Sequence, residues 1–312
     1  MAKSTDSVEK TPAEDLQETL RKENEYIIKN KRVRRQTRRR ALIIILLLFL
    51  LVIGILAGAT YAIMQFVDES NFRVSVTHTG TAWLSLSKDY EFTNPTSVLD
   101  VSAPQSMDNC TLCNYLDQKL EEISQTEGAY TGEGSKDYFI ATTFYLKNSG
   151  KTNVKYRESI TLGRTMKGME KAIRVLLIKD TDPPKDDKGK ITVYAAPKSD
   201  ADGNTLLDEE GNPLLEEVVP PGGMLEAYKP IGNASYEGFV FDEEDIREDG
   251  VWMTKAFVGD GYVMNSELYP LEPDSIIKYT ILIWLEGQDE QCVDAILGGQ
   301  VKISVEFSVE GN

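Results

Sequence analysis

The strongest constraint in the sequence is an apolar run without a formal charge, from Ala41 to Val67. Seventeen of its 27 residues are Leu, Ile, Val or Phe, and Gln65 is the only strongly polar side chain. As a helix the run would be about 40 Å long, more than the ~30 Å of hydrocarbon in a bilayer. A helix that is apolar all round offers no polar face to water, unlike a helix in a soluble domain. We therefore predict a transmembrane helix over residues 41–67.

The length of the run favours a retained signal-anchor over a cleaved signal peptide. Cleavable signals have a short apolar region of about 7–15 residues that ends in a small-residue cleavage site. Here the run is longer and follows a 40-residue head. The small residues of Ala57-Gly58-Ala59 lie inside the run and not at its end.

The charges on the two sides of the run predict its orientation. Asp68 and Glu69 follow it, whereas eight cations precede it: Lys29, Lys31, Arg32, Arg34, Arg35, Arg38, Arg39 and Arg40. The positive-inside rule places this basic cluster in the cytoplasm, against anionic lipid headgroups, and residues 68–312 outside the cell. A nucleic-acid-binding arm is the alternative interpretation of the cluster.

Net charge divides the chain in the same way. Residues 1–40 carry 12 basic and 7 acidic side chains, a net charge of +5, whereas residues 68–312 carry 22 basic and 43 acidic side chains, a net charge of −21. Because binding to phosphate backbones needs an excess of Lys and Arg, the acidic exported part argues against nucleic acid as a partner. The expected partners are the lipid bilayer, other cell-surface components and further copies of the chain.

Two features of the N-terminal region suggest contacts with other proteins. Gly54, Gly58 and Ala62 form a row of small residues of the kind that lets two membrane helices approach closely, which makes this row a candidate for self-association. The head, residues 1–40, is predicted to be partly disordered and partly helical, with a thin apolar stripe from Leu16 to Ile27. This stripe lies on the membrane surface or docks a cytoplasmic partner.

Alternation of apolar and polar residues dominates the exported part. Residues 153–162 and 300–309, NVKYRESITL and QVKISVEFSV, each place apolar side chains on one face and polar ones on the other. This period of two predicts half-buried antiparallel strands. Further strands are predicted at residues 72–77, 82–87, 138–147, 172–178, 191–196, 252–258 and 278–285, with short helices at 112–122 and 291–297. The prediction is a mainly β protein, an antiparallel β-sandwich (jelly-roll-like) over residues 68–312 with insertions.

One insertion, a loop or hairpin near residues 198–223, is rich in turn-forming residues. Its Asp-Gly-Asn and Glu-Gly-Asn sequences supply positions that tolerate a positive φ angle, which predicts a protruding hairpin. Calcium binding is the functional alternative, because Asp200, Asp202 and Asn204 alternate as in a Ca²⁺ loop. The Gly lies one place early, however, and no bidentate Glu follows at the required distance. No other cofactor or metal site is expected.

The chain has three cysteines, Cys110, Cys113 and Cys292, all in the predicted exported part. A disulfide of Cys292 with Cys110 or Cys113 would connect the N-terminal strands to the C-terminal ones. Three reduced thiols are the alternative. Three Cys with at most one His are too few for an ordinary structural zinc site, which has four ligands.

The sequence favours a non-catalytic protein. His78 is the only histidine, which removes most Ser-His-Asp and Cys-His mechanisms unless His78 itself is the base. The sequence contains no H-E-x-x-H, G-x-S-x-G or phosphate-binding glycine motif. A carboxylate pair that hydrolyses a glycoside is the remaining catalytic alternative.

Two stretches resemble known surface proteins. Residues 138–160, YFIATTFYLKNSGKTNVKYRESI, are similar to the recurring unit of the TasA/camelysin group of Gram-positive surface proteins. This resemblance implies an exported jelly-roll-like sandwich and, for some members, fibre assembly by strand exchange. Residues 279–311 look like the closing block of membrane-anchored surface proteins of low-GC Gram-positive bacteria. The distinctive residues of this block are Trp284, Glu286, Gly287, Asp289 and Cys292.

These observations predict a single-pass, membrane-anchored surface protein whose exported β-sandwich acts by binding or assembly, in the cell envelope or an extracellular matrix. The alternative is a transmembrane sensor or an envelope-assembly component in which residues 1–40 bind a cytoplasmic partner. The sequence departs from TasA-type proteins in its long basic head and retained anchor, which argues against assembly into free fibres.

Overall fold

The structure is a computed structural model. It describes Arg21, Tyr26, Lys29, Ile44 and residues 46–54, 72–77, 83–101, 106–111, 113–135, 137–181, 189–200, 202–218, 240–241, 243–259 and 261–310. The chain divides into two compact units, Met1–Phe66 and Val67–Asn312.

The described residues of the first unit are helical, namely Arg21, Tyr26, Lys29, Ile44 and residues 46–54. The large apolar side chains of residues 46–53 are between 45% and 62% exposed. Within the described part of the chain, no helix combines the length and apolar character needed to cross a membrane. Residues 41–43, 45 and 55–67 of the predicted transmembrane segment lie outside the described residues.

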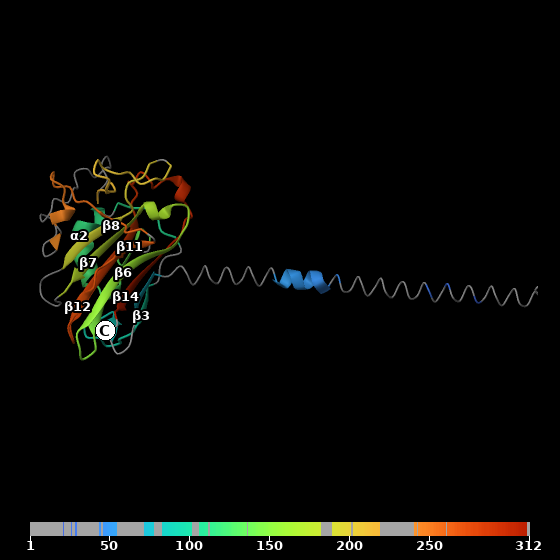
Figure 1. Cartoon of the computed structure of the whole chain (residues 1–312), viewed down its shortest axis with the longest axis horizontal. Coiled ribbons are helices and arrows are strands. Elements are labelled where there is room, and N and C mark those ends of the chain that lie inside the picture. The colour runs from blue at the N-terminus through green and yellow to red at the C-terminus, as the bar shows by residue number, and fades with distance from the viewer. Residues whose placement is uncertain are drawn as a thin grey trace, which may run out of the picture. The chain divides into compact units, whose positions relative to one another are not determined.

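The second unit is mainly β and contains two sheets (Figure 1). Among the described residues, the six-stranded sheet has the strand order β11 (Tyr262–Asn265), β6 (Val154–Thr165), β14 (Val301–Val309), β1 (Phe72–Thr77) and β3 (Val98–Val101), with β12 (Tyr269–Leu271) also paired to β6. Its strands follow the predicted alternation. In β1, Phe72, Val74 and Val76 are buried, whereas Arg73 and Thr77 are exposed.

The eight-stranded sheet has the order β10 (Lys255–Ala256), β8 (Lys190–Ala195), β7 (Ile173–Asp180), β13 (Ile276–Leu285), β5 (Phe139–Asn148) and β2 (Leu84–Ser87); β4 (Gly128–Ala129) pairs with β5, and β9 (Val240–Phe241) with β8. The central strands β7, β13 and β5 are antiparallel neighbours. Among the described residues of this unit, the helices are α2 (Cys113–Gln125) and the short 3-10 helices η1 (Met169–Lys171), η3 (Glu243–Asp245) and η4 (Asp294–Ile296).

The two sheets pack against each other through one apolar core. Val74, Ile160 and Phe307 of the smaller sheet share this core with Phe144 and Ile281 of the larger one. Each of these side chains is at most 1% exposed. The expected two-sheet arrangement is therefore present, because the apolar face of each sheet is covered by the other.

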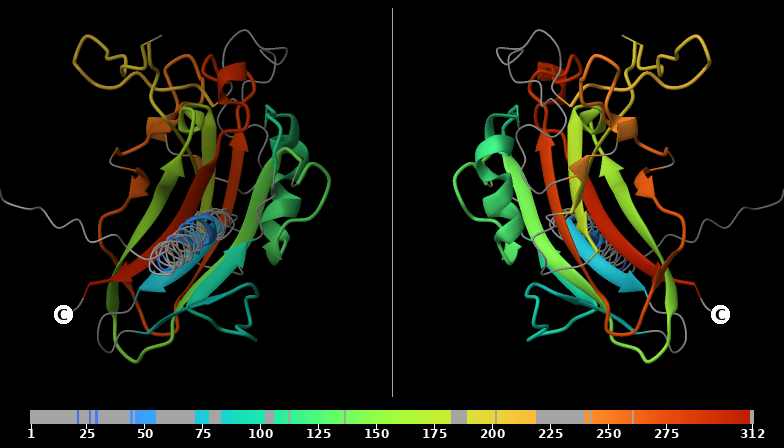
Figure 2. Two further views of the ribbon diagram at one scale, coloured as in Figure 1. Left: turned by 90° about the vertical axis from the view of Figure 1, so that its right-hand side faces the viewer. Right: turned by 90° about the vertical axis from the view of Figure 1, so that its left-hand side faces the viewer.

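The larger sheet differs from the half-buried strands predicted at residues 153–162 and 300–309, which belong to the smaller sheet. A second core covers its other face, where Leu176, Leu282 and Trp284 pack with Leu120 of α2 and Trp252 of the 243–259 segment. Figure 2 shows α2, in green, lying outside β5. Because both faces of the larger sheet are covered, β7 and β13 are nearly continuous apolar runs without strict alternation.

The expectation of a wholly antiparallel sandwich also needs correction. β1 runs parallel to β14, from the pair Arg73 and Ser304 to the pair Thr77 and Ser308. Two-residue contacts of β8 with β9 and β10 are parallel as well. Two parallel strands must be joined by a long connection. Between β1 and β14 this connection is almost the whole domain.

Apart from 252–258, the predicted strands are found with small shifts of their ends, and β1 has the predicted bounds. The 252–258 segment is mostly irregular and contains only the two residues of β10. The predicted helix at 112–122 corresponds to α2, and that at 291–297 is reduced to η4. Strands β3, β4, β9, β11 and β12 were not predicted, because two to four residues are too short to show a clear period.

Candidate functional site

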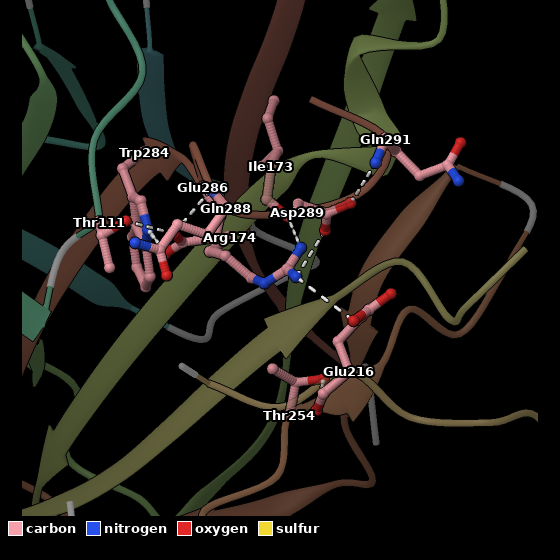
Figure 3. Close-up of polar contacts among 10 residues, drawn as sticks. All are labelled: Thr111, Ile173, Arg174, Glu216, Thr254, Trp284, Glu286, Gln288, Asp289 and Gln291. Carbon is pink, nitrogen blue, oxygen red and sulfur yellow. Dashed lines mark hydrogen bonds and ion pairs between the residues drawn. The ribbon is translucent and has the colours of Figure 1, made fainter. Parts of the chain in front are cut away.

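A buried group of charged side chains lies where β7 begins and β13 ends (Figure 3). Arg174 is the second residue of β7 and pairs in register with Trp284 of β13. Both side chains are fully buried, on the face of the sheet that carries the second core. An arginine at this place is unusual because a desolvated charge is costly unless it is paired.

The Arg174 guanidinium is paired with two carboxylates. Its Nη2 lies 2.6 Å from Asp289 Oδ2 and 3.8 Å from Glu216 Oε2. Its Nη1 donates to the carbonyl of Ile173 at 3.4 Å, whereas the Nε–H donates to none of the described groups. The close contact with Asp289 is the main compensation for the buried charge, because charge-assisted hydrogen bonds are the strong ones.

Glu286 is the third carboxylate of the group and is fully buried. It accepts hydrogen bonds from Thr111 Oγ1 at 2.9 Å, from Trp284 Nε1 at 3.0 Å and from the Gln288 backbone N–H at 3.3 Å. Burial raises the pKa of Glu286, although these donors and Arg174 oppose the shift.

The turn after β13 carries Glu286 and Asp289 and is held by its own hydrogen bonds. The Asp289 N–H donates to the carbonyl of Glu286, and the Gln291 N–H donates to Asp289 Oδ1 at 2.7 Å. Gly287 N–H donates to the carbonyl of Cys110, and a Cβ on Gly287 would lie 2.6 Å from Asn109 Oδ1. The glycine thus leaves room for the Asn109 side chain beside the end of the sheet.

A projecting segment, here called the arm (residues 198–200 and 202–218), reaches the group from the other side. Figure 2 shows it in gold beyond the ends of the strands. It follows an eight-residue spacing in which Asp200, Asp208 and Glu216 are equivalent, as are Gly203 and Gly211. Both glycines have φ close to +90°. The first two acidic residues close turns, and the third, Glu216, reaches Arg174.

Each turn of the arm is closed by its own carboxylate. Asp200 Oδ1 accepts the backbone N–H of Asp202 at 3.0 Å and of Asn204 at 2.8 Å. Asp208 Oδ1 does the same for Glu210 and Asn212, at 2.9 and 2.8 Å. Hydrogen bonds from Asn204 and Asn212 lower the pKa of Asp200 and Asp208 respectively.

The base of the arm is tied to the 243–259 segment. The Glu216 carbonyl accepts from the Thr254 N–H at 2.9 Å and from Thr254 Oγ1 at 3.1 Å. The Val218 N–H donates to the carbonyl of Trp252, and Glu217 Oε1 lies 2.9 Å from Arg247 Nη2. The arginine group therefore joins three segments that are far apart in sequence: 108–111, the arm and the 286–292 turn.

A second polar group crosses the core between the sheets. Glu158 of β6, 4% exposed, accepts from Tyr156 Oη at 2.9 Å and from Tyr279 Oη at 2.5 Å, and it pairs with Lys179 of β7. The Lys179 ammonium also lies 4.1 Å from the centroid of the Tyr269 ring. The carboxylate and the ammonium thus compensate each other between the two sheets.

The structure places the proposed calcium ligands in the first turn of the arm. Asp202 and Asn204 contribute their backbone N–H groups to Asp200, and Asn204 Nδ2 donates to Asp200 Oδ2 at 3.0 Å. An antiparallel β-bridge between Ser199 and Thr205 spans this turn. Among the described residues, no three His, Cys, Asp or Glu side chains are arranged to hold a metal ion.

The other predicted site residues are only partly described. The Cys292 side chain is partly buried, and burial raises the pKa of its thiol. The backbone of Cys110 pairs with the end of β13 beside Glu286, and Cys113 begins α2, its side chain lying outside the described residues. The pairing of the three cysteines stays a prediction.

In the N-terminal unit, Lys29 and Gly54 are helical. The other predicted residues of that unit, together with His78 of the second unit, lie outside the described residues: Lys31, Arg32, Arg34, Arg35, Arg38, Arg39, Arg40, Gly58 and Ala62.

Comparison with known proteins finds no matching family model and no matching curated protein. Three of the five residues that distinguish the closing block, Trp284, Glu286 and Asp289, lie together in the arginine group. Sequence reasoning missed Arg174, Glu216 and Thr111, their partners. The arginine inside the apolar strand Ala-Ile-Arg-Val-Leu-Leu-Ile was the available signal, because a charge there needs a partner.

The arrangement is suited to holding segments together. Arg174, Glu286 and Asp289 make their contacts with one another and with neighbouring protein groups. The exposed part of the site is the arm, whose Leu206, Leu207, Leu214 and Leu215 are between 36% and 57% exposed.

Proposed function

We propose that the chain is a single-pass, membrane-anchored surface protein of a Gram-positive bacterium. Residues 1–40 lie in the cytoplasm, residues 41–67 cross the membrane, and the β-rich unit acts outside the cell by binding or assembly and not by catalysis. The proposal rests first on the uncharged run at 41–67 and on its basic N-terminal flank.

The helical residues 46–54 support a membrane location. Their apolar side chains are 45–62% exposed over residues 46–53, without a polar face. Such a helix is unfavourable in water, since each exposed Leu, Ile or Phe forgoes about 1.5–3 kcal/mol of burial. In the hydrocarbon of a bilayer, all of these side chains are removed from water at once, which is favourable.

A binding role for the β-rich unit is supported by the way its polar groups are used. Its buried charges are engaged in joining segments, at Arg174 and at Glu158. Its projecting arm presents apolar side chains to the outside. Sites that work by contact have this combination of a rigid base and an exposed apolar surface.

Protease added to intact cells tests the location. We expect an epitope tag after Asn312 to be lost and a tag before Met1 to be protected until the cells are lysed. A protected C-terminal tag would contradict the proposal, and so would a mature N-terminus beyond Ala59. A cytoplasmic enzyme measured in the same samples controls for cell integrity.

A sensor or envelope-assembly role is the second candidate. It is supported by the helical conformation of Arg21, Tyr26 and Lys29 in the head, which would suit a docking helix for a cytoplasmic partner. Deleting residues 1–28 leaves the basic cluster in place and separates the two candidates. Loss of the cellular phenotype with normal surface display would favour the sensor, whereas an unchanged phenotype would favour the binding or matrix role.

A further inference from the structure

We infer that the arm is a docking surface for a cationic amphipathic segment of another protein. This inference deepens the proposed binding function, on which it rests, and names the chemistry of the partner. Three properties of the arm support it: its backbone is held in one conformation, its leucines are exposed, and its charge is strongly negative.

The arm is held by a closed triangle of backbone hydrogen bonds. The Leu206 N–H donates to the carbonyl of Lys198 at 2.8 Å, the Leu214 N–H to that of Leu206 at 2.9 Å, and the Lys198 N–H to that of Leu214 at 2.9 Å. The turns at Asp200 and Asp208 close the backbone between these positions. A surface that is already ordered loses little conformational entropy on binding.

The leucines of the arm are placed for contact with a partner. Leu206 and Leu214 occupy equivalent positions, hydrogen-bonded to each other, and Leu207 forms a β-bridge with Pro213. Together with Leu215 they give two exposed leucine pairs within ten residues. Grouped exposed apolar side chains differ from isolated ones in that they mark interaction sites.

The charge of the arm selects the partner. Residues 198–215 contain one cation, Lys198, and five acidic residues: Asp200, Asp202, Asp208, Glu209 and Glu210. The partner should therefore place Lys or Arg around apolar side chains. A second copy of this chain is a poor occupant, because residues 68–312 carry a net charge of −21 and would repel one another.

The attachment of the arm fixes its direction. Glu216 lies at its base and connects to Arg174, and its carbonyl accepts two hydrogen bonds from Thr254. The leucine pairs are thus held beyond the end of the strands, where Figure 2 shows the arm projecting. A partner can reach them without any rearrangement of the sheets.

The test uses the full chain in phosphatidylcholine nanodiscs and a fluorescent peptide with the sequence LKKLLKLLKKLLKL. Fluorescence anisotropy measures its dissociation constant. We expect the variant carrying Leu206→Ser, Leu207→Ser, Leu214→Ser and Leu215→Ser to bind at least about tenfold more weakly. The matched control replaces exposed apolar residues elsewhere, Val98→Ser, Val258→Ser, Val293→Ser and Leu297→Ser, and should bind as the unmodified chain does.

A second variant tests the charge without touching the leucines. Asp202→Asn, Glu209→Gln and Glu210→Gln should weaken binding and reduce its dependence on salt between about 0.05 M and 0.5 M NaCl. Because these side chains are exposed, the variant keeps its melting temperature even if the leucine variant does not. A peptide in which every Leu is replaced by Ser should bind weakly to all variants.

Several outcomes would overturn the inference. Equal binding by the unmodified chain and both arm variants would show that the peptide binds elsewhere or to the lipid. Dimerisation that is lost in the leucine variant would assign the surface to a second copy. The protease experiment on intact cells is independent of the peptide, so a failure of the proposed location is distinguishable from a failure of the arm to bind.

Discussion

Arg174 is paired with two carboxylates in a place that would otherwise be apolar. It lies against Asp289 and Glu216. Burial raises the pKa of the nearby Glu286, and the positive charge of Arg174 opposes this shift. Replacing such a group by apolar residues is often neutral, whereas removing one partner leaves the others uncompensated. The stability of this end of the domain therefore depends more on Arg174 than it would on an arginine in an exposed ion pair.

Arg174→Ala should cost about 3–5 kcal/mol of unfolding free energy, because Asp289 and Glu286 remain buried without their cation. Urea denaturation of the full chain measures the loss. The control is Arg73→Ala, whose ion pair with Asp100 is about half exposed on both sides. Its expected effect is within about 1 kcal/mol. Equal effects of the two substitutions would contradict this view of the arginine group.

Glu216→Gln should make stability less dependent on pH. Burial raises the pKa of Glu216, helped by Asp289 and Glu290 and opposed by Arg174 and Lys198. A carboxyl whose pKa is higher in the folded state than in the unfolded state binds its proton more tightly when the chain is folded, so protonation stabilises the folded state. Its contribution is therefore greatest below the ordinary glutamate pKa of about 4.3 and is lost as the pH rises through the raised value.

As the pH rises above the ordinary glutamate pKa of about 4.3, the unmodified chain should lose stability relative to Glu216→Gln. Urea unfolding at several pH values gives the difference in free energy. The opposite slope would mean that Arg174 outweighs burial at this carboxyl.

Gly189 illustrates how a strand depends on one backbone position. Gly189 precedes β8 with φ of 94°, and a Cβ there would lie 2.6 Å from the carbonyl oxygen of Lys179. The glycine therefore satisfies both a left-handed backbone and a close approach of β7. Because β7 carries Arg174 and Lys179, a shift here would disturb both polar groups.

Gly189→Ala should destabilise the domain by more than about 1 kcal/mol, since it adds a clash with backbone to the strain of a positive φ. Gly250→Ala is the matched control. Gly250 has a similar φ of 82°, but its Cβ would meet nothing within 4 Å. Thermal unfolding of both variants separates the two costs, and equal losses would remove the steric explanation.

The β-rich unit is closed by pairing its first strand with its last. β14 lies between β6 and β1, and its Ile303, Val305 and Phe307 enter the core between the sheets. The smaller sheet is therefore incomplete until the final residues of the chain are in place. This arrangement makes folding of the whole unit depend on contacts that are distant in sequence.

Removing residues 301–312 should abolish the cooperative unfolding transition of the domain, because β1 and β3 would lose their connection to β6. Removing only Gly311 and Asn312 is the control and should have little effect. Near-UV circular dichroism with urea titration measures both. A cooperative transition in the longer truncation would show that the smaller sheet does not need β14.

Local pattern was sufficient for much of the fold. The alternation in residues 72–77 and 301–309 predicted β1 and β14 because period two reports directly which side chains face a core. The same rule left Glu158 unassigned, although its position in β6 is on the buried face. A carboxylate there becomes acceptable only because Tyr156, Tyr279 and Lys179 meet it, and two of these come from other strands.

The sequence alone determines the uncharged run, the division of charge and the period of the strands, because each depends on neighbouring residues. The tertiary structure decides which strands pair, that β1 and β14 run parallel, and that α2 and the 243–259 segment cover the larger sheet. It also assembles Arg174, Glu216, Glu286 and Asp289 from three separate segments. The physical reason is that a buried charge is compensated through space, by whichever groups the packed chain brings within a few ångströms of it.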